Sequence, residues 1–209
     1  MKKVAIVFDH PYGMEAGYNE PHKRSFTSAL LVALLKAMED DGTEVDLIDL
    51  HKDNFNPVMS KQDLINWRTK SFVDPQSQDY FERLQMADEI IMLFPIWWEV
   101  MPAMTKGFLD KVLAKGQIKQ AGATRRLFAS STKVRVLTVS GAPTWIYRIV
   151  FGNPVIRMLK RGVFRKAGIK DFKWHNFNAE DTSPRGRVKM LKSVKKIFSF
   201  KTWDDLIND

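Results

Sequence analysis

The stretch that decides the fold of this chain is Phe94-Pro95-Ile96-Trp97-Trp98-Glu99-Val100-Met101-Pro102-Ala103. It continues an apolar run over residues 90–94, which is too short for a typical helix and predicts a buried strand. Pro95 has no backbone N–H, so we expect strand pairing to end there, and Pro102 suits the first turn of a following helix. The loop between the prolines carries large flat side chains at the carboxyl end of a strand, where open α/β sheets bind ligands. The alternative is that Trp97 and Trp98 pack in a core or an interface.

The composition describes an ordinary globular protein. Its 209 residues are 44% hydrophobic and 27% charged, which predicts one domain over residues 1–209. The absence of cysteine excludes disulfides and thiolate chemistry and agrees with a cytoplasmic location. The apolar run before Asp9 is too short for a signal peptide, and we expect no membrane span.

The net charge of +9 is concentrated late in the chain, in two groups of lysines and arginines over residues 157–173 and 185–201. Such a surplus attracts polyanions or phosphorylated cofactors. The alternative is a solvated helix face. No zinc-finger or RNA-binding signature accompanies the charge, so we expect no nucleic-acid partner.

Strand and helix patterns alternate along the chain. Strands are predicted over residues 4–8, 45–50, 89–94, 134–139 and 172–177, and helices over 25–42, 61–67, 75–87, 102–114 (closed by Gly116), 153–168 and from 183 onward. This alternation predicts an α/β fold with a doubly wound, five-stranded parallel sheet. The expected flavodoxin-like strand order is 2-1-3-4-5, with helices on both faces and the ligand site at the carboxyl ends of the strands.

Three loops follow adjacent strands of that sheet. The first carries His10 and ends where a helix begins at Ser25-Phe26-Thr27, whose backbone N–H groups and hydroxyls suit a phosphate. The second carries the flat side chains after Pro95, and the third is Ser140-Gly141-Ala142-Pro143, where small residues let a ligand approach the backbone. Together they predict a phosphate anchor, an aromatic wall and a polar rim, a site shaped for flavin mononucleotide. The alternatives are simple helix caps and an ordinary tight turn.

The chain resembles the flavodoxin-fold NAD(P)H:quinone oxidoreductases, of the DT-diaphorase, drug-activity modulator and potassium-efflux ancillary reductase type. The resemblance covers about residues 4–147. Its motifs are Ser25-Phe26-Thr27, Asp49-Leu50-His51, Asn54-Phe55-Asn56-Pro57, Ala87-Asp88, Phe94-Pro95-Ile96-Trp97-Trp98, Pro102-Ala103, Lys106-Gly107 and Asp110-Lys111-Val112.

The resemblance implies noncovalent FMN or FAD, NAD(P)H as co-substrate, two-electron transfer to a quinone-like acceptor, and a homodimer with the site at the subunit interface. It implies that His10, Phe26 and Thr27 hold the flavin phosphate region. Pro95, Ile96, Trp97 and Trp98 would line the isoalloxazine, and Val139, Ser140, Gly141 and Ala142 match the family's Thr-Thr-Gly-Gly loop. Val139 and Ala142 depart from that pattern.

Tyr147 matches the tyrosine after that loop and is the candidate catalytic residue, as a proton or hydrogen-bond donor. Asn153 stands where some relatives have a histidine. No metal site is expected, because His10, His22, His51 and His175 lack zinc-like spacing. The alternatives are an electron-carrier flavodoxin and a flavin-binding regulatory protein that docks a partner through the basic C-terminal third.

Overall fold

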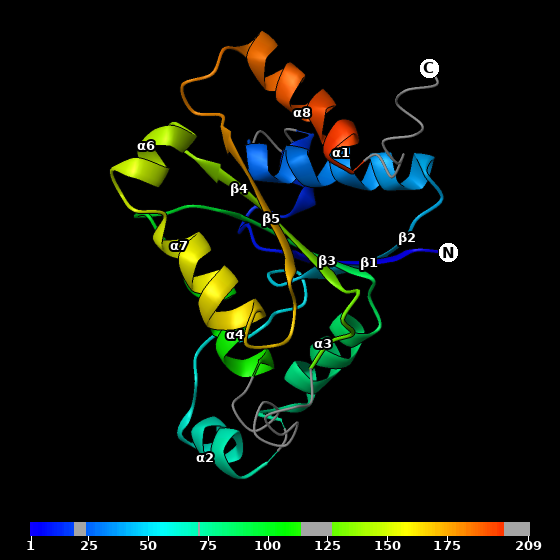
Figure 1. The fold of residues 1–209 in the computed structure, drawn as a ribbon, viewed down its shortest axis with the longest axis vertical. Helices are drawn as coiled ribbons and strands as arrows, with labels where there is room; N and C mark the ends of the chain where they lie inside the picture. The colour runs from blue at the N-terminus through cyan, green and yellow to red at the C-terminus, as the bar shows by residue number, and fades with distance from the viewer. Residues whose placement is uncertain (19–23, 71, 114–126, 199–209) are drawn as a thin grey trace.

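The computed structural model describes residues 1–18, 24–70, 72–113 and 127–198. Its centre is a five-stranded parallel sheet with the order β2-β1-β3-β4-β5 (Figure 1). The strands are β1 (Lys3–Phe8), β2 (Glu44–Asp49), β3 (Glu89–Pro95), β4 (Lys133–Ser140) and β5 (Asp171–Asn178). The predicted fold class and strand order are confirmed.

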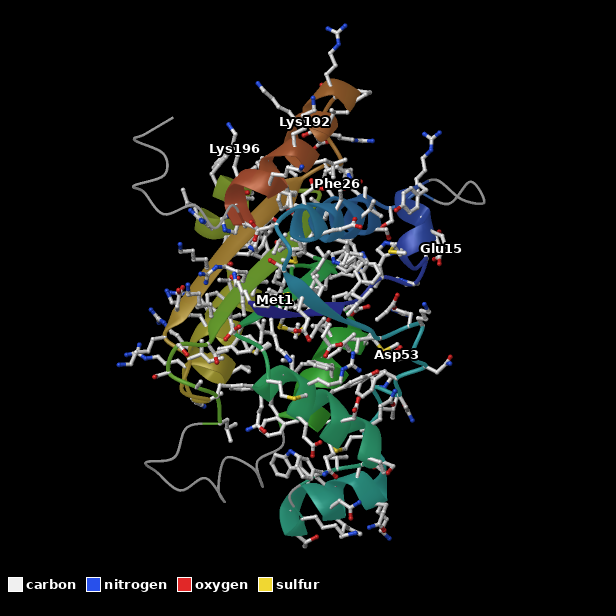
Figure 2. All side chains as sticks on the ribbon, turned by 90° about the vertical axis from the view of Figure 1, so that its right-hand side faces the viewer. Met1, Glu15, Phe26, Asp53, Lys192 and Lys196 are labelled. Carbon is white, nitrogen blue, oxygen red and sulfur yellow. The ribbon has the colours of Figure 1, made fainter. Side chains whose placement is uncertain are left out.

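Helices cover both faces of the sheet (Figure 1). On one face lie α1 (Phe26–Asp40) and α8 (Pro184–Phe198), which carry the labelled Phe26 and Lys192 in Figure 2. On the other lie α3 (Pro75–Gln85), α4 (Ala103–Val112) and α7 (Pro154–Arg157), which continues into the π-helix η2 (Met158–Phe164). The short α2 (Lys61–Thr69) stands beyond α4. Within the described residues, no helix combines the length and the apolar character needed to cross a membrane.

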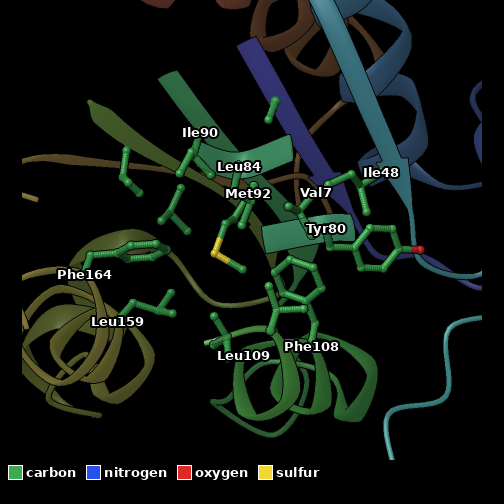
Figure 3. Packing of buried hydrophobic residues seen from close by; sticks show 14 of the residues in the cluster. Val7, Ile48, Tyr80, Leu84, Ile90, Met92, Phe108, Leu109, Leu159 and Phe164 are labelled. Carbon is green, nitrogen blue, oxygen red and sulfur yellow. The ribbon is translucent and has the colours of Figure 1, made fainter. Parts of the chain in front are cut away.

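Each face of the sheet has its own buried apolar cluster, because successive strand residues point to opposite sides. In β1, Ile6 and Phe8 pack toward α1 and α8, whereas Val7 packs toward α3 and α4. Figure 3 shows the second cluster, where Phe108 of α4 and Phe164 of η2 approach the sheet. The sheet is therefore buried on both faces, as its continuous apolar runs predict.

The predicted end of strand pairing at Pro95 is wrong by one residue. Pro95 pairs with Val139, and the N–H of Ile96 donates to the carbonyl of Val139 at 2.7 Å. On the other side of β3, the N–H of Asp9 donates to the carbonyl of Leu93. Because ladder bonds along a parallel strand alternate between its two neighbours, the missing N–H of Pro95 faces β1, and pairing with β4 continues past it.

Smaller elements refine the other predictions. The loop after β1 contains the 3₁₀-helix η1 (Met14–Gly17), and a helix α6 (Thr144–Ile149), which the sequence did not predict, follows β4. The helix predicted over 153–168 is split between α7 and η2. The expected helix stop at Gly116 lies outside the described residues.

Candidate functional site

A cavity of about 580 Å³ lies at the carboxyl edge of the sheet. This volume is in the range of small-molecule sites, roughly 300–1,000 Å³. The lining residues come from the loops after β1 and β5, from the ends of β3 and β4, and from the starts of α1 and α8: His10, Ala16, Gly17, Arg24, Ser25, Phe26, Thr27, Ala29, Pro95, Val139, Ala179, Glu180 and Arg187. Of the predicted site residues, the cavity collects His10, Ser25, Phe26, Thr27, Pro95 and Val139.

The start of α1 presents backbone donors to this cavity. The Ser25 hydroxyl accepts from the N–H of Ser28 at 3.1 Å, so Ser25 is the N-cap of the helix. The first N–H groups of a helix have no partner within it, and those of Phe26 and Thr27 therefore form an anion-binding end. Ser25 caps the N-terminus of α1. The buried Thr27 lines the cavity and brings a hydroxyl group to it.

The loop after β1 is tied to α1 by two hydrogen bonds. The Ser28 hydroxyl donates to the carbonyl of Gly13 at 2.7 Å, and the N–H of Ser25 donates to the carbonyl of Ala16 at 3.3 Å. A Cβ added to Gly17 would lie 2.9 Å from the carbonyl oxygen of Ser28. Glycine at this position therefore allows η1 to approach the first turn of α1, and this packing forms one side of the cavity.

His10 is half-buried at the cavity wall, and burial lowers its pKa from the ordinary value of 6.5. The nearby Asp9 opposes this shift, and His51 adds to it. The Nδ1 of His10 accepts from the N–H of Tyr12 at 3.2 Å. A neutral imidazole with one accepting nitrogen carries its proton on the other, so Nε2 is a hydrogen-bond donor at neutral pH.

Asp9 fixes the position of this loop, a role that sequence reasoning missed. Its buried carboxylate accepts from the N–H and the hydroxyl of Thr105 at 2.8 and 2.5 Å. Its other oxygen lies 2.9 Å from Nε2 of His51. Asp9 thereby joins the end of β1 to the start of α4 and to the loop after β2. The sequence feature that could have identified this role is the position of an acidic residue directly after a buried strand.

Charged groups from the loop after β5 and the start of α8 also line the cavity, and the sequence motifs did not assign them to the site. Arg187 donates from Nε to the carbonyl of Ala179 at 2.7 Å and from Nη2 to the carbonyl of Glu180 at 3.1 Å. Arg24 lies in the same lining. β5 pairs with β4, so its carboxyl end lies at the same edge of the sheet as the three strand ends that carry the predicted loops, a position that already follows from the predicted strand order.

The tryptophan segment forms a tight turn outside the cavity lining. Trp97 and Val100 exchange two backbone hydrogen bonds of 2.9 and 3.0 Å. Trp98 and Glu99 between them have positive φ values of 49° and 63°, which are costly for residues other than glycine. The Trp98 side chain is 97% exposed and that of Trp97 is 45% exposed.

Side chains of β5 support the loop after β4. Asn176 donates to the hydroxyl of Ser140 at 2.7 Å, and that hydroxyl donates to the carbonyl of Ala142 at 2.9 Å. A Cβ added to Gly141 would lie 2.3 Å from Oε2 of Glu180. The Glu180 carboxylate therefore lies against the Cα of Gly141, at the rim where a ligand edge was predicted, and it is the end of a flexible side chain that can move.

Tyr147 is completely buried below the tryptophan turn, and its hydroxyl donates to the carbonyl of Glu99 at 2.8 Å. Burial raises its pKa to about 12, with a smaller contribution from the charge of Glu99. The predicted site residues outside the cavity lining are Ile96, Trp97, Trp98, Ser140, Gly141, Ala142 and Tyr147. Their roles toward a ligand stay predictions.

The described residues contain no group of three or more His, Cys, Asp or Glu side chains placed to hold a metal ion. His51 contacts Asp9, and His175 lies on the edge strand β5. His22 lies outside the described ranges.

Comparison with known proteins gives one family match and several relatives. The model of a family described as having a flavodoxin-like fold matches residues 2–197. The chain is 32% identical over 111 residues to an uncharacterized NAD(P)H oxidoreductase of Haemophilus influenzae. The matched region covers 53% of this chain and 50% of that protein. It is 26% identical over 196 residues to NAD(P)H dehydrogenase (quinone) 1 of Rattus norvegicus, covering 83% and 72%. The chain spans about half the length of the H. influenzae relative and of a similar Escherichia coli protein.

Solved structures share the fold. An NAD(P)H:quinone oxidoreductase from Methanothermobacter marburgensis superimposes with a TM-score of 0.75 at 20% identity, over 93% of this chain and 92% of that one. An FMN-dependent NADH-azoreductase from Bacillus anthracis, solved in complex with FMN, has a TM-score of 0.68 at 16% identity, over 95% and 98%.

Proposed function

Because this chain belongs to the flavodoxin-like fold family, we propose that it is a flavoprotein that uses NAD(P)H to reduce a quinone or a similar acceptor by two electrons. This membership confirms the resemblance predicted from the sequence motifs. The observation that carries the proposal is the cavity at the carboxyl edge of the sheet, where the first turn of α1, His10 and two arginines meet.

The donor set of the cavity fits a flavin phosphate. The N–H groups of Phe26 and Thr27, the Nε2–H of neutral His10 and the guanidinium groups of Arg24 and Arg187 favour an anion in this cavity. Pro95 and Val139 give the same cavity an apolar wall toward β3 and β4. An anionic end and an apolar wall are what a flavin requires. The FMN in the B. anthracis azoreductase supports testing FMN before FAD.

When bound, the flavin supplies the hydride chemistry between NAD(P)H and the acceptor. The chain holds and orients it. The first turn of α1 would anchor the phosphate end, and Pro95 and Ile96, at the junction of β3 and the tryptophan turn, would line the ring. Backbone N–H groups of the Ser140–Ala142 loop would meet the polar ring edge, and Asn176 donates to Ser140 and so holds that loop. Tyr147 supports the turn through Glu99.

We further propose that the protein is a homodimer. Seven large apolar side chains near the site are 44% exposed or more: Trp97, Trp98, Val100, Trp145, Ile149, Val150 and Phe151. They come from the tryptophan turn, from α6 and from the residues after it. Exposed apolar groups in such number mark interaction surfaces, and a second copy would cover the open side of the flavin site.

The purified protein provides the test. We expect flavin absorbance in the isolated protein or after incubation with FMN or FAD, release of that flavin on denaturation, and oxidation of NADPH or NADH that depends on an added quinone. Trp97→Ala should weaken flavin retention. Lack of any flavin binding would exclude the proposed site, whereas bound flavin without quinone-dependent oxidation of either nucleotide would favour an electron carrier.

A further inference from the structure

We propose that the groove between η2, α7 and β5 is a second ligand site, which binds a small molecule carrying two or more phosphate groups. A cavity of about 450 Å³ lies there, separate from the flavin site. Its lining residues are Arg148, Asn153, Ile156, Arg157, Lys160, Arg161, Arg165, Phe172 and Trp174. It therefore contains five cationic side chains and no acid.

The cations of this cavity gather around one space without an acidic partner in the described part of the chain. Some basic side chains elsewhere do form ion pairs, such as Arg83 with Asp46 and Lys195 with Asp40. Among the described residues, none of the five cations that line this cavity lies within ion-pair distance of a carboxylate. Like charges gathered around one cavity repel one another, so an anion that binds there relieves this repulsion.

The helical geometry places these cations in pairs on the same side. Arg157 and Arg161 are four positions apart, a spacing that shares one face of a helix. The N–H of Arg165 donates to the carbonyl of Lys160 at 3.1 Å, a bond that spans five residues, and this π-helical turn brings Lys160 and Arg165 to the same side. π-Helical turns occur frequently at functional sites. Arginine side chains also suit phosphate, because their planar fork donates two hydrogen bonds at once.

A second observation concerns a buried acceptor. The side-chain oxygen Oδ1 of Asn153 is buried and has no hydrogen-bond partner among the described residues. Asn153 lines the cavity and has a left-handed backbone with φ of 55°. A buried acceptor without a partner is costly, and a ligand hydroxyl or amino group would satisfy it once the Asn153 side chain turns Oδ1 toward the cavity. Phe172 and Ile156 add apolar surface to the same cavity. This combination favours a phosphorylated nucleoside or sugar over bare phosphate.

A neighbouring cavity extends the positive region. Its volume is about 530 Å³, and it shares Lys160, Arg165 and Phe172 with the first while adding Lys170. The two cavities form a continuous basic groove along the edge strand β5. A ligand with several phosphates can therefore contact cations from both, whereas a monophosphate can contact only some of them.

Titration calorimetry with ADP, inorganic pyrophosphate and adenosine tests the proposal. We expect ADP to bind more tightly than pyrophosphate, and adenosine not to bind. The double variant Arg157→Gln, Arg161→Gln should weaken ADP binding at least tenfold. The control Lys189→Gln, Lys192→Gln removes the same charge from exposed positions of α8 and should change the affinity less than twofold. Asn153→Gly keeps the left-handed backbone accessible and should weaken ADP without affecting pyrophosphate.

Three results would overturn the proposal. The first is that neither ADP nor pyrophosphate binds. The second is equal weakening by the two double variants, which would show diffuse attraction to a basic protein. The third is a pair of observations: the wild type binds no phosphate compound, and the Arg157→Gln, Arg161→Gln variant changes its oligomeric mass. This would mean that the groove is a contact between two copies of the chain. ADP and pyrophosphate resemble parts of FMN and NAD(P)H, so the Arg157→Gln, Arg161→Gln variant, whose residues lie outside the flavin cavity, distinguishes binding in this groove from binding at the other site.

Discussion

The hydroxyl of Tyr147 donates to the backbone carbonyl of Glu99 at 2.8 Å, and Glu99 is one of two adjacent residues with positive φ in the tryptophan turn. Because Trp98 and Glu99 hold an unfavourable backbone conformation, something else in the fold must stabilise the turn. Tyr147 is fully buried below it. The geometry therefore gives Tyr147 a positioning role, in addition to the donor role predicted from the sequence.

Replacing Tyr147 by phenylalanine removes this hydrogen bond. We expect a loss of about 1 kcal/mol in the free energy of unfolding, and hence a melting temperature lower by roughly 2–4 °C in a chain of this size. Flavin reduction by NADPH should slow by about tenfold or more, while the flavin stays bound. Thermal unfolding and stopped-flow absorbance measure the two effects. Tyr18→Phe, at an exposed position, is the control, and wild-type behaviour of Tyr147→Phe in both assays would contradict the positioning role.

Glu180 places a negative charge in the cavity that we assign to an anionic cofactor, beside the Cα of Gly141. Glu180→Gln keeps the shape and removes the charge, so we expect flavin to bind about tenfold more tightly. Fluorescence titration of the apoprotein with FMN measures this affinity at low salt, and the gain should shrink as salt is added. Glu82→Gln, an exposed change on α3, should leave the affinity unchanged. Equal or weaker binding by Glu180→Gln would mean that its carboxylate does not face the bound flavin.

The stability of the protein should depend on two histidines near pH 6. Burial is the largest cause that lowers the pKa of His10 and of His175 below 6.5 in the folded protein. As the pH falls through 6.5, the unfolded chain therefore takes up protons that the folded protein does not bind. This stabilisation is present above about pH 6.5 and is lost toward the lower folded-state pKa. The double variant His10→Gln, His175→Gln should show a smaller fall in melting temperature between pH 7.5 and 5.5 than the wild type, and an equal fall would contradict the assignment.

Flavin reduction should be nearly independent of pH between about 6.5 and 8, since unperturbed tyrosine titrates near 10. The raised pKa of Tyr147 and the lowered pKa of His10 both move titration away from this range. Stopped-flow reduction by NADPH measures the rate at each pH. A clear inflection inside the range would mean that another group carries charge in the reductive step.

Gly107 allows α4 to pack closely against the loop after β2. A Cβ at this position would lie 2.3 Å from the carbonyl oxygen of Pro57, so Gly107→Ala must displace backbone and should cost about 1–3 kcal/mol. Gly162→Ala is the matched control, because its nearest neighbour is Cγ of Met158 at 3.8 Å. Chemical denaturation of the two variants should show a clear loss of stability in the first and little change in the second. Equal stabilities would show that the Pro57 loop adapts without cost.

The proposed homodimer predicts a mass of twice the 24.2 kDa chain in light scattering at micromolar concentration. Ile149→Arg places a charge on the exposed apolar surface of α6, where the side chain is 76% exposed, and should shift the mass toward the monomer. Val58→Arg, at a position that is 68% exposed on the loop before α2, should leave the dimer intact. A monomeric wild type would contradict the proposal.

Sequence alone determined the sheet. Continuous apolar runs predict strands buried on both faces, and their alternation with helical periodicity leaves few topologies, so the order 2-1-3-4-5 follows from local patterns and general rules. The phosphate end was also predictable, because Ser25, Phe26 and Thr27 occupy a helix start after a strand, and capping chemistry is local in sequence.

Tertiary structure alone decided which side chains meet. Tyr147 and Glu99 are 48 residues apart, and Glu180 reaches Gly141 only because β5 pairs with β4. The effect of Pro95 on pairing was also decided by the tertiary structure. Its missing N–H faces β1, so the pairing of β3 with β4 is kept at this residue. The placement of Lys160 and Arg165 on the same side also depends on a π-helical turn in place of an α-helical one. The periodicity of apolar residues indicates which face of a helix or strand is buried, because burial repeats with the geometry of the backbone. Contacts between loops that are distant in sequence depend on how the packed sheet arranges the ends of its strands.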